Sequence, residues 1–282
     1  MKRHKRKATA TKIENASLIV VCARSWRKYP MQKDVHAKKI EIALGEAGAE
    51  DYEKGIHWTG WDFIHKHFVS ARWGKKFHGL FLDCGCGTGL VARNLVSAGR
   101  EVVGMDISKN MCRVTKQICG VDVIVADCLN LPFRDQAFSV ACVSGVLHHF
   151  PQQLQSAFLE LGRCAKKGIC IIEPSATPPH PILRLLLFLQ NGYEWVLRRT
   201  AYKHSRTKYS HSIFEDPLDP EKLRKLFEKQ DFQVSEMIFF NKIPYFPPFS
   251  VTCLPSKLRK HLIRSMISST RGTDVEIIAI HG

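Results

Sequence analysis

Short apolar runs alternate with longer amphipathic stretches between residues 79 and 174, and this alternation restricts the fold more than any other feature of the chain. Runs of this length, bounded by glycine or polar residues, are typical of buried strands, and the stretches between them have helical periodicity. A parallel sheet with helices on its faces is the expected result. Strands are predicted over residues 79–84, 101–106, 121–127, 138–145 and 168–174, and helices over residues 88–99, 109–118 and 151–165.

Two more strands and a helix are predicted near the C-terminus. Residues 219–230 have a proline just inside a helix start, a position that proline favours. Residues 232–240 and 274–282 have the composition of strands. The predicted sheet therefore has seven strands.

The chain of 282 residues carries a formal charge of +16, which favours association with an anionic partner such as a nucleic acid or a membrane surface. Six of the first twelve residues are Lys or Arg and none is acidic. Residues 1–15 are therefore predicted to be a solvated, disordered tail. A nuclear localisation signal or a nucleic-acid-binding arm is the alternative.

Residues 16–23, ASLIVVCA, resemble the apolar region of a secretory signal, but Glu14 precedes them and Arg24 follows at once. A short buried element is predicted instead. No run of 18 apolar residues is present, which argues against a spanning helix. The ten cysteines are scattered from residue 22 to residue 253, so free thiols in a reducing compartment are expected. We expect a cytoplasmic protein, with the nucleus or a membrane surface left open by its charge.

The stretch LDCGCGTGL ends the first predicted strand and opens the first predicted helix. Glycines at such a turn let backbone N–H groups approach a ligand and place a helix N-terminus beside it. Gly87, Gly89 and Ala92 fit a variant of the dinucleotide fingerprint, with Asp106 at the spacing of a ribose contact. The same stretch also reads D-x-G-x-G-x-G from Asp83. The pattern alone leaves two cofactors open, a nicotinamide dinucleotide and S-adenosylmethionine.

Acidic residues at the strand ends separate the two cofactor classes. The carboxylate of Asp83 would repel the pyrophosphate of a dinucleotide, whereas S-adenosylmethionine has no phosphate and carries a sulfonium and an ammonium group. The next two strands end in Asp106 and Asp127, at the sheet edge where open α/β folds bind ligands. Asp106 is suited to the ribose hydroxyls and Asp127 to the adenine amino group. S-adenosylmethionine, with S-adenosylhomocysteine as the product, is the predicted cofactor.

Cys84 and Cys86 raise the alternative of a metal site. A structural zinc site needs four ligands, commonly in Cys-x2-Cys or Cys-x3-Cys pairs, and no second pair lies near these two residues. No metal is predicted. Both thiols are expected to fill space beside the loop.

Four stretches together resemble the class I S-adenosylmethionine-dependent methyltransferases, and within them the type 11 group of small-molecule enzymes. They are FLDCGCGTGLVARNL, VVGMDISKNM, ADCLNLPFRDQAFSVACVSGVLHHF and ELGRCAKKGICIIEP, and the resemblance is continuous over residues 79–174. It implies an α/β fold with a Rossmann-like, seven-stranded, mostly parallel sheet and an antiparallel C-terminal strand. It also implies helices on both faces of the sheet and lid insertions. The resemblance does not cover the ends of the chain, and the residues before the first strand are predicted from their own pattern to be an N-terminal helical lead-in.

Residues 16–282 are accordingly predicted to form a single methyltransferase domain. Its predicted parts are an N-terminal helical extension over residues 16–75, a cofactor-binding core over residues 76–174, and substrate-side lids over residues 175–216 and 241–270.

The resemblance also implies roles for single residues. Asp83, Gly85 and Gly87 would line the methionine end of the cofactor, Asp106 the ribose, and Ser144 the floor under the sulfonium. The predicted cofactor residues are Asp83, Gly85, Gly87, Gly89, Asp106, Ile107, Asp127, Cys128 and Ser144.

His148 and His149 follow the fourth predicted strand, where a substrate would enter. Methyl transfer from a sulfonium is an in-line displacement, so a base is needed only if the nucleophile must lose a proton. Either imidazole is a candidate for that role, and packing or capping of the next helix is the alternative.

Two classes of methyl acceptor remain open. Apolar stretches within residues 182–197 and 243–249 favour a small or lipid-like molecule, with nearby basic residues resting on an anionic membrane surface. The basic N-terminus favours RNA as the alternative, although no recognisable RNA-binding module is present. A non-catalytic binding or scaffold role is disfavoured because the cofactor acids are intact. The oligomeric state is not predicted.

Overall fold

The structure of the chain is a computed structural model. It describes residues 38–39, 42–50, 52–53, 61–177, 185, 188–189, 216–240, 255, 257–258, 267–268 and 272–282. The predicted tail over residues 1–15, the element over residues 16–23 and most of both predicted lids lie outside this set.

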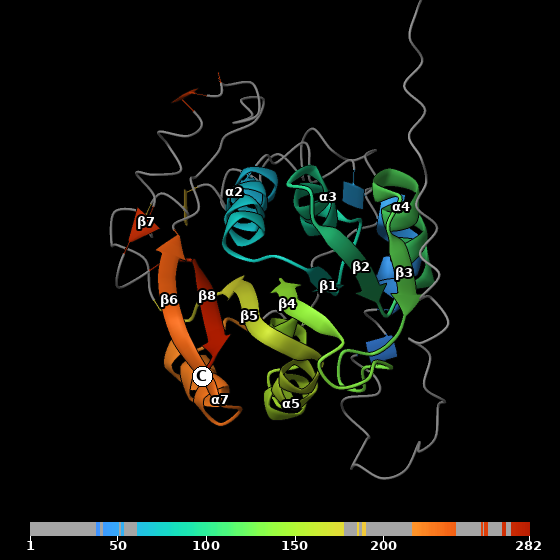
Figure 1. Cartoon of the computed structure of the whole chain (residues 1–282). Coiled ribbons are helices and arrows are strands. Elements are labelled where there is room, and N and C mark those ends of the chain that lie inside the picture. Colours follow the sequence, from blue (N-terminus) through green and yellow to red (C-terminus); the bar gives the residue numbers. More distant parts are fainter. Residues whose placement is uncertain are drawn as a thin grey trace, which may run out of the picture.

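The described strands form one sheet in the order β3-β2-β1-β4-β5-β8-β6-β7 (Figure 1). Strands β1 to β5 pair in parallel, and β8 is antiparallel to both β5 and β6. The strands are β1 (Leu80–Cys84), β2 (Glu101–Asp106), β3 (Asp122–Val125), β4 (Phe138–Ser144), β5 (Ala165–Pro174), β6 (Phe232–Phe240), β7 (Ile267–Ser268) and β8 (Asp274–His281).

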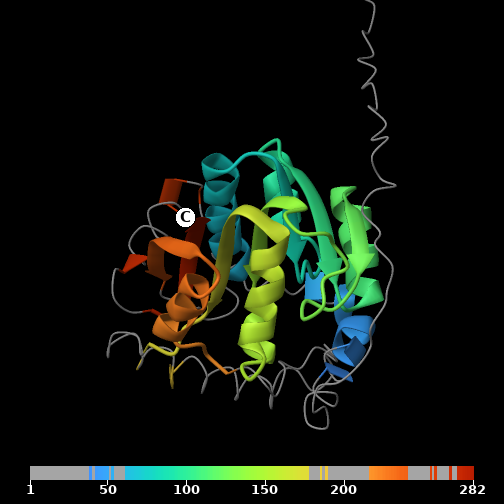
Figure 2. The same cartoon turned by 60° about the horizontal axis from the view of Figure 1, so that its bottom comes forward.

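Helices cover both faces of this sheet (Figures 1 and 2). One face carries α2, α3 and α4, and the opposite face carries α5 and α7. Their bounds are α2 (Trp61–Lys76), α3 (Leu90–Ser97), α4 (Lys109–Cys119), α5 (Leu154–Cys164) and α7 (Pro220–Glu228), and η2 (Leu147–His149) is a short 3-10 helix after β4. No described helix is long and apolar enough to cross a membrane.

The predicted fold class is confirmed. All seven predicted strands are present, with the C-terminal strand antiparallel as expected, and the two-residue β7 adds an eighth strand at the edge of the described sheet. Element bounds differ by a few residues. Helix α3 starts at Leu90, two residues later than predicted, because Gly89 adopts a left-handed φ of 87° and its N–H closes a turn onto the Cys86 carbonyl.

Local sequence explains where several helices begin and end. Ser108 caps α4, since its hydroxyl accepts from the Met111 N–H, and Gly120 ends that helix in the left-handed conformation. Asp219 caps α7 by accepting from the Glu221 N–H, with Pro220 at the first helical position.

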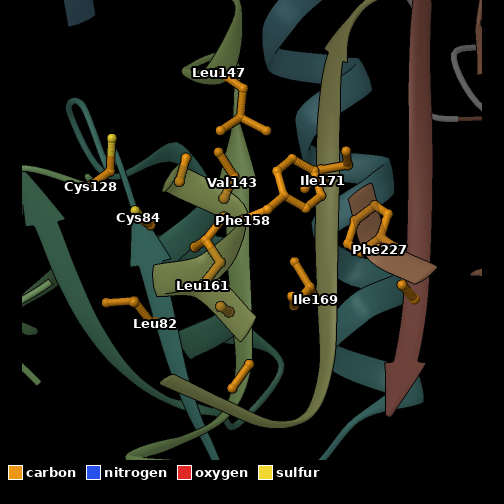
Figure 3. Packing of buried hydrophobic residues seen from close by; sticks show 14 of the residues in the cluster. Leu82, Cys84, Cys128, Val143, Leu147, Phe158, Leu161, Ile169, Ile171 and Phe227 are labelled. Atoms are coloured by element: carbon orange, nitrogen blue, oxygen red, sulfur yellow. The ribbon is translucent and has the colours of Figure 1, made fainter. Parts of the chain in front are cut away.

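The sheet separates two apolar cores. Under α5 and α7, the rings of Phe158 and Phe227 pack edge to face, with their centroids 4.7 Å apart, and contact the inner strands (Figure 3). Under α2 and α3, fully buried Trp73 and Leu95 pack against the other face of the sheet. Burial on both faces explains why the central strands are nearly continuous apolar runs.

The order of the sheet fixes where a ligand binds. From β1 the chain proceeds outward through β2 and β3, and then returns to the other side of β1 with β4 and β5. The carboxyl ends of β1 and β4 therefore border the crevice at the point where strand order reverses, which is the usual binding position in open α/β sheets.

Candidate functional site

A cavity opens at this edge of the sheet. Its described wall contains residues from the ends of β1, β2, β3 and β4, together with residues from α2 and from the segment before it. This N-terminal segment is described at residues 38–39, 42–50 and 52–53. They are Lys38, Gly45, Tyr52, Lys66, Asp83, Gly85, Cys86, Gly87, Thr88, Leu90, Val91, Met105, Asp106, Ile107, Ser108, Met111, Ala126, Asp127, Cys128, Ser144, Gly145, Val146, His149, Phe150 and Gln153.

The glycine loop after β1 forms the floor of the cavity. The N–H groups of Gly85 and Cys86 both donate to the Met105 carbonyl, at 2.7 and 2.8 Å, which ties the loop to β2. Gly85 has a φ of 76°, and a Cβ at this position would overlap the Val146 side chain. Only glycine fits here without strain, because both the backbone conformation and the close approach of Val146 exclude a side chain.

Asp83, the last but one residue of β1, is fully buried at the bottom of the cavity. One carboxylate oxygen accepts from the Ala92 N–H at 3.0 Å. Burial raises the pKa of Asp83 to about 7, although the Ala92 N–H and the positive charge of Lys66 act in the opposite direction. A cationic ligand group would stabilise the ionised form of this carboxyl.

Asp106, at the end of β2, holds the glycine loop and the start of α4 together. Its two oxygens accept from the Gly87 N–H and the Ser108 N–H, each at 2.9 Å. Burial raises the pKa of Asp106, against the effect of these N–H donors. The carboxylate retains acceptor capacity for two hydroxyl groups in the cavity.

Asp127, just beyond β3, lies at the far end of the same edge. One oxygen accepts from the Leu129 N–H at 3.0 Å, and the other forms an ion pair with Lys38 at 2.6 Å. Lys38 belongs to the N-terminal segment, 89 residues away in sequence.

The N-terminal segment is docked beside this end of the cavity. Glu46 accepts from the Ser108 hydroxyl at 2.9 Å and from the Asn110 N–H at 3.0 Å, and the Asn110 amide donates back to the Glu46 carbonyl. A Cβ on Gly45 would lie 2.8 Å from the Ser108 Cβ, so the helical residues 42–50 pack tightly on the turn after β2.

Two buried hydroxyl groups in the cavity wall have no hydrogen-bond partner among the described residues. They belong to Thr88 and Ser144, whose exposed fractions are 1% and 8%. Buried polar atoms are normally satisfied, so unpaired hydroxyls that line a cavity indicate a polar ligand.

The two candidate histidines occupy different environments. His149 lines the cavity, whereas His148 is not among the described lining residues. The His148 Nδ1 lies 2.8 Å from the buried Glu173, whose other oxygen accepts from the N–H groups of Val146 and Leu147. Burial opposes ionisation of Glu173, but the bonds from His148 and these N–H groups hold its pKa below the usual value. Through these hydrogen bonds, Glu173 holds the loop after β4 and the His148 ring in place.

Most predicted cofactor residues come together in this cavity. Asp83, Gly85, Gly87, Asp106, Ile107, Asp127, Cys128 and Ser144 all line it. Gly89 is not among the described lining residues. A Cβ on Gly89 would lie 2.6 Å from the Cys119 sulfur, so this glycine serves the packing of α3 on α4. The individual roles of all these residues stay predictions.

Five described lining residues lie outside the sequence motifs, namely Lys38, Gly45, Tyr52, Lys66 and Gln153. The first four precede the first strand, where no motif occurs, and only the fold brings them to the sheet edge. The thiols are placed as expected: Cys84 is buried in the core, and Cys86 is buried in the cavity floor.

Comparison with known proteins agrees with this architecture. Residues 82–172 match the family described as "Methyltransferase domain". A demethylmenaquinone methyltransferase of Staphylococcus haemolyticus is 29% identical over 164 residues, which cover 54% of this chain and 67% of the relative. One of Thermobifida fusca is 33% identical over 129 residues, 43% of this chain and 54% of the relative. The matched region, residues 82–172, is an S-adenosylmethionine-dependent methyltransferase domain.

Solved structures show the same fold. The magnesium protoporphyrin IX methyltransferase of Synechocystis, with bound S-adenosylhomocysteine, aligns with a TM-score of 0.55 at 14% identity and covers 87% of this chain and 100% of its own. A possible histamine N-methyltransferase of Thermotoga maritima aligns with a TM-score of 0.55 at 20% identity. The alignment covers 85% of this chain and 99% of that protein.

The residues of the cavity fit the cofactor of this methyltransferase, which is S-adenosylmethionine. Asp106 would take the ribose, Asp127 the adenine amino group and Asp83 the ammonium group, while the unpaired hydroxyls of Thr88 and Ser144 would meet its polar atoms. Bound there, the cofactor supplies an electrophilic methyl group on a sulfonium.

Proposed function

We propose that this enzyme methylates a small, lipid-like aromatic acceptor of the hydroquinone type. The relatives that cover about half of the chain are named demethylmenaquinone methyltransferases, which supports an acceptor of that class. The proposal rests chiefly on the cavity wall contributed by the loop after β4.

That wall combines an apolar and aromatic surface with a single imidazole. Val146, His149 and Phe150 line the cavity beside Ser144, at the carboxyl end of β4. A flat aromatic ring fits between apolar side chains of this kind, and a hydroxyl on the ring would meet the imidazole.

The enzyme's contribution is alignment, exclusion of water and removal of a proton. The acceptor donates an electron pair to the methyl carbon, the carbon–sulfur bond breaks, and its electron pair remains on sulfur in S-adenosylhomocysteine. In this proposal His149, which lines the cavity, takes the proton that a hydroquinone hydroxyl must lose to become a strong nucleophile. His148 instead supports the loop through Glu173.

The acceptor class is tested by incubating the purified protein with methyl-labelled S-adenosylmethionine and one of two acceptors. One is a dithionite-reduced 2-prenyl-1,4-naphthoquinone, and the other is total transfer RNA. Label is expected in the organic extract of the first reaction. Label in RNA alone would contradict the proposal and favour the RNA alternative raised by the basic N-terminus.

The role of His149 is tested with the His149→Asn variant. Loss of a general base is expected to lower kcat by about 10²- to 10⁴-fold, with the affinity for S-adenosylmethionine unchanged. The exposed His78 provides a control, because its ring contacts Arg100 outside the described cavity wall, and His78→Asn should retain full kcat. A larger kcat loss in folded His148→Asn than in His149→Asn would reverse the assignment.

A lipid-like acceptor also implies access from a membrane surface, and we include peripheral contact with an anionic bilayer in the proposal. Leu185, Phe188 and Leu189 are 58%, 72% and 51% exposed and have the i, i+3, i+4 spacing of one helical face. The sequence that follows is basic, with Arg198, Arg199 and further cations up to residue 206. Phe188→Asp should abolish sedimentation with phosphatidylglycerol vesicles, and equal sedimentation of variant and wild type would remove this part.

A further inference from the structure

Lys66 is a cation in the wall of the cofactor cavity that no family motif contains. It lies in α2, 16 residues before the first residue of the matched methyltransferase region. A Cβ built on Gly145 would lie 3.5 Å from the Lys66 Nζ and 3.8 Å from the His148 Cε1. The ammonium group of Lys66 is therefore next to the backbone of the loop after β4.

This position is at the methionine end of the cavity. Asp106 and Asp127 mark the adenosine end, where the ammonium of Lys38 is bound to Asp127. Asp83 and Ser144 mark the opposite end, below the loop that Lys66 contacts. The charge of Lys66 also acts on the carboxyl of Asp83. Among the lining lysines and arginines that the structure describes, Lys66 is the one at this end.

The methionine part of the cofactor carries two opposite charges, an ammonium and a carboxylate. Asp83 supplies an anion for the ammonium, but a carboxylate placed near the Asp83 carboxylate without a cation would be strongly disfavoured. The hydroxyls of Thr88 and Ser144 offer neutral hydrogen-bond donors in the same wall, and they lack partners among the described residues. A cation is the group still required there, and Lys66 supplies it.

We propose that Lys66 binds the carboxylate of the methionine part of S-adenosylmethionine and thereby selects a donor with an intact amino-acid end. The inference depends on the cofactor and not on the identity of the methyl acceptor. It differs from a purely structural role, in which Lys66 would only offset the buried charge of Asp83.

The test compares two methyl donors by calorimetry, S-adenosylmethionine and its decarboxylated form, which lacks only the carboxylate. Wild-type protein should bind the intact donor about ten- to hundredfold more tightly, the range expected for a charge-assisted hydrogen bond in a buried site. In Lys66→Met this preference should disappear, because affinity falls for the intact donor and stays equal or rises for the decarboxylated one.

Matched variants complete the design. Lys66→Arg keeps the charge and should keep most of the preference, whereas Lys75→Met removes an exposed lysine of the same helix and should change neither affinity. Thermal unfolding identifies any variant that has not folded. Equal weakening of both donors in folded Lys66→Met would show a structural role and overturn the proposal, and so would an unchanged preference. Failure of the naphthoquinol assay would not affect this result, since no acceptor is used.

Discussion

The cofactor cavity has two walls of different origin. One wall is the sheet edge, where Gly85, Asp83 and Asp106 are placed by backbone conformation and by hydrogen bonds to N–H groups. The other wall is the N-terminal segment with α2, where Lys38 and Lys66 reach the cavity with long side chains. The first wall is part of the sheet itself. In the second wall, α2 packs on the core through Trp73, and the N-terminal segment is attached by the polar contacts of Glu46 and by a small apolar cluster of Ala49 with Met111 and Val114.

This difference predicts different consequences of mutation. Changes in the sheet wall should alter the stability of the domain together with cofactor binding, because the glycine loop that lines the cavity is hydrogen-bonded to β2. Changes in the N-terminal wall should alter affinity while leaving the core intact, because ion pairs at partly exposed positions contribute little to stability. The following variants test this separation, beginning with the largest expected effect.

Gly85→Ala should destabilise the domain by about 2–5 kcal/mol. A left-handed non-glycine residue costs about 1–2 kcal/mol, and overlap with Val146 adds about 1–3 kcal/mol. The control is Gly99→Ala, which has the same φ of 76° but nothing within 4 Å of its Cβ. Urea unfolding should show only the backbone contribution in Gly99→Ala. Equal losses in both variants would show that Val146 does not restrict the loop.

Asp83 should give cofactor binding a pH dependence centred near its pKa of about 7. The ionised carboxylate is the form that attracts the ammonium group, so affinity for S-adenosylmethionine should be about tenfold weaker at pH 6 than at pH 8. Asp83→Asn should bind more weakly and without this dependence. Calorimetry at the two pH values measures it, and an unchanged pH dependence in Asp83→Asn would assign the titration to another group.

Stability without ligand should change with pH in the opposite sense. The folded-state pKa of Asp83 is raised, so its contribution is fully present below about pH 4 and is lost as pH rises through about 7. Glu276, bonded to Arg72 and to the Trp73 indole, has its pKa raised to about 7 by burial and adds a contribution of the same sign. Glu276→Gln should therefore reduce the pH dependence of unfolding without changing that of cofactor affinity.

Glu46→Ala should weaken binding of S-adenosylmethionine about three- to tenfold, because the N-terminal segment loses its bonds to Ser108 and Asn110. Gly45 and Tyr52 of that segment line the cavity, so a looser segment should mainly raise the dissociation rate. Stopped-flow dissociation measures this change. A large drop in the urea midpoint would contradict the distinction between the two walls.

Glu50→Gln should have the smallest effect, less than about twofold in cofactor affinity. Glu50 of the same segment forms an ion pair with Arg113 of α4, but the two side chains are 66% and 45% exposed. This variant is the matched control for Glu46→Ala. Equal effects of the two would show that net charge, and not the docking of Glu46 on Ser108, determines affinity.

The sequence predicts the sheet wall well because its information is local. Buried parallel strands appear as apolar runs, and the acids after three successive strands must share one edge of the sheet. Asp83, Asp106 and Asp127 could therefore be brought together without a structure. Helix and strand bounds were less accurate, as at α3, where the left-handed Gly89 delays the helix start.

The sequence does not predict the N-terminal wall, because the contacts that form it are long-range. Lys38 meets Asp127 across 89 residues, and no spacing rule reports such a contact. Adjacent residues can also differ in ways that no pattern shows: His148 is bonded to the buried Glu173, while His149 lines the cavity. The direction of each ring depends on the turn of η2 after β4.

Titration of the protein with S-adenosylhomocysteine in a calorimeter, for wild type and Asp106→Ala, tests the central claim that this sheet-edge cavity holds the cofactor. We expect one molecule bound per chain in the wild type and at least about a hundredfold loss in the variant, because two hydrogen bonds from ribose hydroxyls to a charged group are removed. The absence of binding by folded wild-type protein, or equal affinity in Asp106→Ala, would contradict the claim.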